Sequence, residues 1–205
     1  LFVDHDMVQT EMMWVSKADG FNAELLPQAS LFNEYFGSGL SSIVFQEIRE
    51  AKALAYGASA SFSTPRKKEE AHFVRVFIGT QADKLNDAVD AMSVLMSDMP
   101  VNENQFNGAR TAAMKRIASD RITKERIYWS YDAVQRLGRT DDIRKLSYDK
   151  LPGITVNDLK TFFDAKIKGR KYTYLVIGKK SALNMESLQK LGTVRELSKQ
   201  EIFGY

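Results

Sequence analysis

Residues 32–42 read FNEYFGSGLSS, residues 44–49 read VFQEIR, and residues 53–56 read ALAY. Apolar side chains recur every three or four positions from residue 25 to residue 36, which predicts an amphipathic helix that ends at the glycine-rich residues 37–39. Ser41 or Ser42 can cap a second helix. We therefore predict two helices in series, joined by a turn that passes close to another stretch of backbone.

Strand patterns lie on both sides of these helices. Runs rich in β-forming residues occupy residues 8–16, 56–63, 71–79 and 172–177. A short charged loop joins the second run to the third, which predicts a β-hairpin. Alternation in the third run places His72 and Val74 on one face and Phe73 and Arg75 on the other. Residues 8–16 or 71–79 could offer an edge to an extended peptide, but the sequence does not show which edge is free.

Helical periodicity returns after the hairpin. Thr80 and Asp83 have the spacing of a helix-capping pair, and the apolar stripe after them continues to Pro100. Thr155 and Asp158 form a second such pair. Amphipathic helices are predicted at residues 80–100, 102–120, 123–137 and 155–167.

The order of these elements indicates the fold class. Strands joined as a hairpin and helices gathered in blocks are typical of an α+β protein. We predict a two-layer sandwich, in which helices pack on one face of a mainly antiparallel sheet. No linker rich in proline or glycine interrupts the chain, so we expect residues 1–205 to form a single domain.

The composition excludes several classes of protein. Of the 205 residues, 44% are hydrophobic and 27% are charged, and the formal net charge is +3. The basic residues 66–68 are followed at once by two glutamates, which indicates a solvated loop tip and no nucleic-acid surface. The absence of cysteine excludes disulfides and thiolate chemistry. No apolar run approaches the roughly 20 residues of a membrane-spanning helix, so we expect no membrane insertion.

The sequence also offers few catalytic residues. Its two histidines, His5 and His72, are too far apart to bind a metal from one helix, and we predict that the chain itself holds no metal. We expect His72 on a strand face and His5 in a solvated segment. The glycines at residues 37–39 precede a helix, as in a phosphate-binding loop, but the lysine and the preceding strand of a P-loop are missing.

Ser38, Ser41 and Ser42 are the remaining candidate nucleophiles in this region. None of them has a neighbouring histidine in the sequence to act as a base, so only a residue brought close by the fold could activate them.

The pattern of residues 32–56 resembles that of pitrilysin-type (M16) zinc metallopeptidase domains. These domains have a helix ending in a glycine-rich turn, two small residues, a helix that ends in Ile-Arg-Glu or Leu-Arg-Glu, and a Gly-Leu-x-Tyr sequence leading into a strand. Later stretches that also resemble the family are residues 120–138, 155–163, the strand ending at Gly178, residues 192–194 and residues 203–205. Two features depart from the family pattern: Ala53 replaces the usual glycine, and the H-x-x-E-H zinc motif is missing.

The resemblance implies a LuxS/MPP-like metallohydrolase-type domain, namely the C-terminal, non-zinc-binding domain of an M16 peptidase. The chain begins in a strand-like segment, and we expect it to be a fragment of a longer, multi-domain protein. The parent would be a zinc metalloendopeptidase whose zinc is bound by another domain, so this chain alone should be inactive. The implied partners are an N-terminal catalytic M16 domain, in the same chain or a paired subunit, and a peptide substrate. Periplasmic, secreted and cytoplasmic locations stay open, and the bacterial periplasm is favoured.

The resemblance also implies roles for Arg49 and Tyr56. Tyr56 would donate its phenol to the scissile carbonyl as negative charge develops, and Arg49 would hold the substrate backbone or help to stabilise that charge. Without the resemblance, Arg49 could pair with Glu47 or Glu50, and Tyr56 could be a half-buried strand aromatic. The alternative function is a non-enzymatic M16-like scaffold or processing-complex subunit that acts by protein–protein association.

Overall fold

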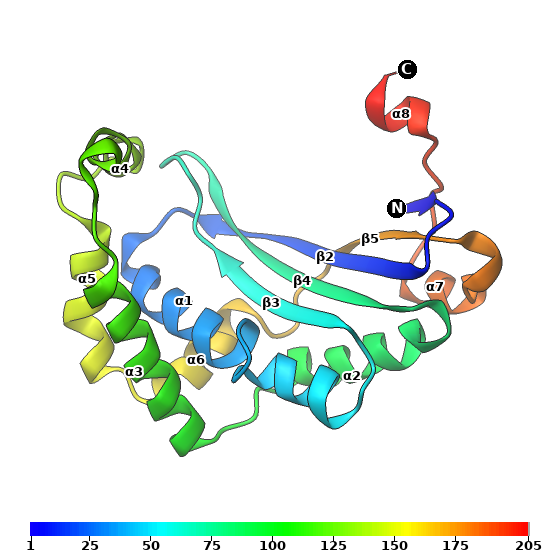
Figure 1. Cartoon of the computed structure of the whole chain (residues 1–205), viewed down its shortest axis with the longest axis horizontal. Helices are drawn as coiled ribbons and strands as arrows, with labels where there is room; N and C mark the ends of the chain where they lie inside the picture. Colours follow the sequence, from blue (N-terminus) through cyan, green and yellow to red (C-terminus); the bar gives the residue numbers. More distant parts are fainter. Residues whose placement is uncertain (205) are drawn as a thin grey trace.

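The computed structural model describes residues 1–204, and their strands form one five-stranded sheet in the order β1-β5-β2-β4-β3 (Figure 1). The strands are β1 (Phe2–Asp4), β2 (Gln9–Gly20), β3 (Gly57–Ser63), β4 (Ala71–Gln81) and β5 (Thr173–Gly178). β1 and β5 are parallel, whereas every other neighbouring pair is antiparallel. The mainly antiparallel sheet and the hairpin are therefore confirmed. Of the family-like residues 203–205, Tyr205 lies outside the described residues.

The helical layer covers one face of this sheet. Figure 1 shows α1, α2, α3 and α6 beneath the strands, while α4 and α8 project near the two ends of the sheet, which confirms the predicted two-layer α+β arrangement. The α-helices are α1 (Leu26–Phe32), α2 (Leu85–Ser97), α3 (Glu103–Ser119), α4 (Ile127–Arg136), α5 (Ile143–Lys150), α6 (Val156–Lys166), α7 (Met185–Leu191) and α8 (Lys199–Phe203). Two π-helical segments, η2 (Asn33–Gly37) and η3 (Phe45–Ala51), follow α1.

Short 3-10 turns precede or connect several of these helices. They are η1 (Ala23–Leu25), η4 (Ala82–Lys84), η5 (Lys124–Arg126), η6 (Leu151–Gly153) and η7 (Lys180–Ala182). The capping box predicted from Thr155 and Asp158 is present at the start of α6. The capping pair predicted from Thr80 and Asp83 is wrong, because Thr80 still belongs to β4 and its hydroxyl donates to the carbonyl of Leu54.

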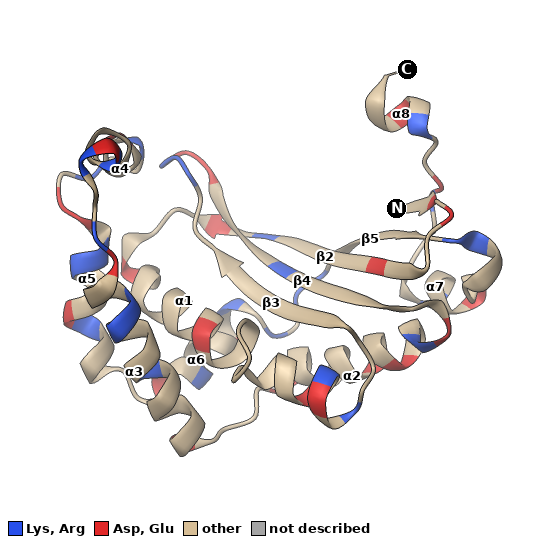
Figure 2. Cartoon of the chain, in the orientation of Figure 1, with Lys and Arg blue, Asp and Glu red and all other residues tan. Residues whose placement is uncertain are grey.

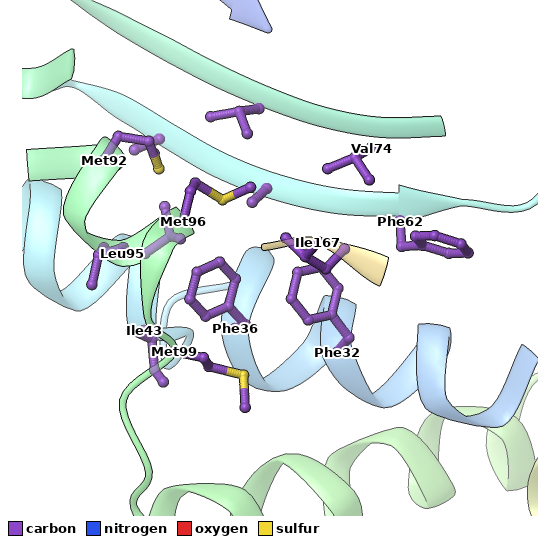
Figure 3. Close-up of a cluster of buried hydrophobic side chains, with 14 of the residues drawn as sticks. Phe32, Phe36, Ile43, Phe62, Val74, Met92, Leu95, Met96, Met99 and Ile167 are labelled. Atoms are coloured by element: carbon purple, nitrogen blue, oxygen red, sulfur yellow. The ribbon is translucent and has the colours of Figure 1, made fainter. Parts of the chain in front are cut away.

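The hydrophobic core lies between the sheet and the helical layer. Figure 3 shows aromatic side chains of α1 and η2 facing the sheet, with methionines of α2 beside them. The labelled residues of this cluster are Phe32, Phe36, Ile43, Phe62, Val74, Met92, Leu95, Met96, Met99 and Ile167. A fully buried side chain of this size contributes about 1.5–3 kcal/mol relative to an exposed one. This cluster therefore fixes the helices on the sheet.

His72 lies in this core, on the buried face of β4 with Val74, as the alternation predicted. Its Nδ1 lies 3.0 Å from the carbonyl oxygen of Ser63, and the backbone N–H of Asn22 donates to its Nε2 at 3.2 Å. Phe62 stacks on the imidazole ring with 4.8 Å between ring centroids. These contacts require a neutral ring, with the proton on Nδ1, and burial lowers the pKa of His72 below its ordinary value.

The segment after α1 docks on the outer edge of β3. The side-chain amide of Asn33 donates to the carbonyl of Phe62 at 3.2 Å and its oxygen accepts from the Phe62 N–H at 2.8 Å. A Cβ atom on Gly37 would lie 1.8 Å from the carbonyl oxygen of Ala60, so only glycine fits there. The predicted close approach of the glycine turn to another backbone is thus confirmed.

The strand order determines which strands lie at the edges of the sheet. β2 and β4, which contain residues 9–16 and 71–79, both lie inside the sheet and have a partner on each side. The expectation that either of them offers a free edge to a peptide is therefore wrong. β3 is an edge strand, but Asn33 already occupies its outward-facing groups at Phe62.

Charged residues are distributed over the whole molecule. Figure 2 shows basic and acidic segments interspersed along the helices and loops. Many of them form exposed ion pairs, such as that of Arg195 with Glu201 at 3.1 Å. Among residues 1–204, no helix has both the length and the apolar character that crossing a membrane requires.

Replacing Gly37 by alanine should destabilise the chain by about 3 kcal/mol or more, because the new methyl group would overlap the backbone of β3. Gly108 provides a matched control, since a Cβ atom there meets nothing within 4 Å. Gly108→Ala lies inside α3 and should stabilise the chain by about 0.5–1 kcal/mol. Urea unfolding of both variants checks this prediction, and equal effects would contradict it.

The buried, neutral His72 should make stability depend on pH. Its folded pKa is lowered, so its contribution is complete above the unfolded value of about 6.5 and is lost as the pH falls toward the folded value. The loss should reach at most about 1.4 kcal/mol per pH unit. His72→Gln can keep both hydrogen bonds without titrating. We expect urea unfolding at pH 7.5 and 5.5 to show a larger loss for the wild-type chain than for this variant, whereas parallel losses would exclude His72 as the cause.

Candidate functional site

The candidate site spans the end of η3, which carries Arg49, and the connection from η3 to β3, which carries Tyr56. The connection turns at Ala53, whose φ of 50° is in the left-handed region that favours glycine. A glycine at this position, as in the sequence pattern that residues 32–56 resemble, would adopt this conformation without the cost of a Cβ atom. The Leu54 N–H donates to the carbonyl of Ile48 at 3.0 Å and closes the end of the helix.

Tyr56 is placed just before β3, with 51% of the residue exposed. Its backbone N–H donates to the carbonyl of Gly79 at 2.8 Å, which ties the residue to the end of β4. Its phenolic oxygen accepts a hydrogen bond from Nε2 of Gln81 at 2.7 Å. The phenol therefore points to solvent from a fixed backbone position.

Arg49 lies in the last turn of η3, and 47% of its side chain is exposed. Its Nε lies 3.7 Å from a carboxylate oxygen of Glu50, and its guanidinium group lies over the ring of Phe45, 4.9 Å from the centroid. An exposed ion pair of this kind contributes only about 0–1 kcal/mol. In the described part of the chain, Arg49 and Tyr56 make separate contacts and do not bond to each other, so both polar ends can turn to a ligand.

The remaining candidates from the sequence have local structural roles. The Ser42 hydroxyl donates to the carbonyl of Gly39 at 2.8 Å and accepts from the Phe45 N–H, as a helix cap does. The Ser38 hydroxyl donates to the carbonyl of Asn33. These contacts support turn and capping functions, and no nucleophile is assembled from them.

His5 is exposed, and the acidic residues beside it are already bonded. Asp6 pairs with Lys179 at 3.0 Å, and Asp4 accepts from the Lys180 backbone N–H at 2.9 Å. Within residues 1–204, no group of three or more histidine, cysteine or acidic side chains is placed to hold a metal ion.

The structure also exposes an aromatic surface that the sequence pattern did not predict. We expected residues 123–137 to bury an apolar stripe, but no residue of α4 is buried. Tyr128 and Trp129 are each 65% exposed and Tyr131 is 62% exposed. A cavity of about 440 Å³ lies beside α4 and is lined in part by Tyr131 and Ile143. In the sequence, the apolar and aromatic residues of α4 are not confined to one face of the helix. Because α4 lies apart from the helical layer, these side chains stay exposed.

Ala53→Gly should stabilise the chain by about 0.5–1 kcal/mol. The left-handed conformation costs a residue with a Cβ atom about 1–2 kcal/mol, and the greater entropy of glycine in the unfolded chain offsets about 0.4–1 kcal/mol of that. Ala51→Gly, two residues earlier at the end of η3, should instead destabilise by about 0.5–1 kcal/mol. Urea unfolding of the pair measures the difference, and a loss of stability in both variants would contradict the prediction.

Solved structures share this fold at low sequence identity. The peptidase M16 inactive domain from Pseudomonas fluorescens aligns with a TM-score of 0.71 and 16% identity, over 89% of this chain and 43% of that one. A protease from Helicobacter pylori gives 0.67 and 13%, over 87% and 43%. A chain of complex III2 from Candida albicans gives 0.64 and 11%, over 94% and 49%. The chain thus spans less than half the length of each of these structures.

The family itself is identified by sequence. No curated protein sequence matches the chain significantly. Residues 2–112, which include the candidate site and more than half of the 205 residues, match the peptidase M16 inactive domain. The chain therefore belongs to the peptidase M16 inactive domain family.

Proposed function

We propose that this chain is the substrate-binding, non-catalytic half of a zinc-dependent endopeptidase. In this proposal it encloses and orients an unfolded peptide, which a separate domain with the H-x-x-E-H motif hydrolyses. The observation that carries the proposal is the placement of Arg49 in the last turn of η3 and Tyr56 just before β3, both with exposed side chains, in an M16 inactive domain.

Zinc is the metal that this family context implies. The described residues of this chain do not fit it, because no suitable group of ligands is present in residues 1–204. The metal would belong to the other domain, where it would polarise the scissile carbonyl and activate water. The chain covers only 43% of the Pseudomonas fluorescens structure, and we propose that residues 1–205 form one domain of a longer chain or of a paired assembly.

The residues of this chain would act on the substrate from a domain that does not itself hold the metal. The phenol of Tyr56 would donate a hydrogen bond to the scissile carbonyl oxygen as its negative charge grows. A fixed donor in such a position contributes about 2.7–4 kcal/mol to transition-state stabilisation. Arg49 would bind the peptide backbone, because its planar guanidinium group offers several donors to carbonyl oxygens.

A second function is favoured by a different observation. Tyr128, Trp129 and Tyr131 expose an aromatic surface on α4, and tyrosine and tryptophan are enriched in protein–protein interfaces. The same fold occurs in a chain of complex III2 from Candida albicans. These features support the alternative of a non-enzymatic scaffold or processing-complex subunit, in which Arg49 and Tyr56 would have no kinetic role.

Substitutions at Arg49 and Tyr56 in the full-length protein separate the two functions. Tyr56→Phe removes one hydroxyl and should lower kcat and kcat/KM together by roughly 10²–10³ in cleavage of a quenched fluorescent peptide. Arg49→Ala should also raise KM, and Arg49→Lys should restore only part of the loss, since an ammonium group lacks the planar fork.

Tyr148→Phe is a matched control. Tyr148 is also an exposed tyrosine, but it lies on α5, so this change should leave the kinetics unchanged. Circular dichroism would establish that each variant is folded. Wild-type kinetics in both Tyr56→Phe and Arg49→Ala would exclude the substrate-binding function and leave the scaffold function.

A further inference from the structure

We infer that Gln81 is a positioning residue for Tyr56, which holds the phenol through its oxygen and leaves the phenolic proton free for a substrate carbonyl. The inference rests on the proposed function and adds to it a residue that lies on a different element of the fold. Gln81 is the last residue of β4, and Tyr56 precedes β3.

The direction of the hydrogen bond carries the argument. Nε2 of Gln81 donates to the phenolic oxygen of Tyr56 at 2.7 Å. An amide NH₂ group is a donor only, whereas a phenol can accept one hydrogen bond and donate another. The bond with Gln81 therefore does not use the phenolic proton, and that proton can be directed to a second acceptor.

The same bond also affects the strength of the second one. A hydroxyl group that accepts a hydrogen bond is polarised and becomes a better donor. Gln81 presents its NH₂ group to the phenolic oxygen, so it polarises the hydroxyl without accepting a hydrogen bond from it. A carboxylate at the same position would be an acceptor only, and the phenol would donate its hydrogen bond to that carboxylate and not to the substrate. The residue type at position 81 thus matters as much as its place.

The backbone beneath the two side chains is firmly tied together. Besides the bond from Tyr56 to Gly79, the buried hydroxyl of Thr80 donates to the Leu54 carbonyl at 2.5 Å. Nζ of Lys84 donates to the Ala53 carbonyl at 3.2 Å. The end of β4 and the turn that follows it therefore hold the turn before β3 at three backbone positions.

The side chain of Tyr56 has less support than its backbone. About half of the residue is exposed, and the hydrogen bond from Gln81 holds its phenolic oxygen. Displacing a catalytic group by about 1 Å can cost as much as 10²-fold in rate. A neutral hydrogen bond contributes about 0.5–1.5 kcal/mol, so its loss should lower kcat by about 2- to 12-fold.

The test uses the full-length protein and the same fluorescent peptide. Gln81→Met keeps the length of the side chain but cannot donate, and it should lower kcat by about 2- to 12-fold with little change in KM. Gln81→Glu should lower kcat at least as much, because its carboxylate accepts the hydrogen bond that the phenol would otherwise donate to the substrate. Gln9 lies opposite Gln81 on β2, and Gln9→Met is the matched control that should keep wild-type kinetics.

A double variant shows whether Gln81 acts through Tyr56. In a Tyr56→Phe background, Gln81→Met should cause no further loss, since the bond is already missing. An equal loss in both backgrounds would overturn the inference, as would full activity of Gln81→Glu. Wild-type kcat in Gln81→Met, together with a reduced kcat in Tyr56→Phe, would overturn the inference and leave the proposed function standing. Wild-type kcat in Tyr56→Phe would overturn both.

Discussion

The close contact of the segment Asn33–Gly37 with the edge of β3 is the constraint on which the rest of the structure depends. Gly37 approaches the carbonyl of Ala60 so closely that no other side chain fits, and the amide of Asn33 satisfies both backbone groups of Phe62. The chain from there to Tyr56 is thus anchored at its start on β3 and at its end on β4. The turn that carries the candidate site has little freedom to move between these anchors.

Much of this fold could be predicted from local patterns. The helical period of residues 25–36, the alternation in β4 and the capping box of Thr155 each depend on neighbours within a few residues. The features that could not be predicted depend on contacts between residues that are far apart in the sequence. Thr80 has the spacing of a helix cap, but its hydroxyl meets the carbonyl of Leu54, 26 residues earlier in the chain. The π-helical form of η2 and η3 and the order of the strands likewise follow from tertiary packing.

The residues of the candidate site also differ in whether the sequence could indicate them. Arg49 and Tyr56 were found only through a resemblance, because a surface arginine and a strand tyrosine have ordinary structural explanations. Gln81 gave no signal at all, since its bond to Tyr56 joins residues that lie 25 positions apart. Ala53 was visible as a departure from a family pattern, and its positive φ supplies the physical reason for that pattern.

A domain that assists chemistry performed elsewhere needs rigidity at the few atoms that meet the substrate, and it needs a separate surface to meet its partner. The turn before Tyr56 has the first property, because backbone and side-chain bonds from β4 and η4 converge on it. α4 has features suited to the second, with exposed aromatic side chains on a helix that contributes nothing buried to the core. The two features lie on different elements, so the proposed substrate binding and the alternative protein association would use separate surfaces. Neither feature depends on a zinc motif, so under the proposed function a domain without that motif would still contribute to a reaction that another domain carries out.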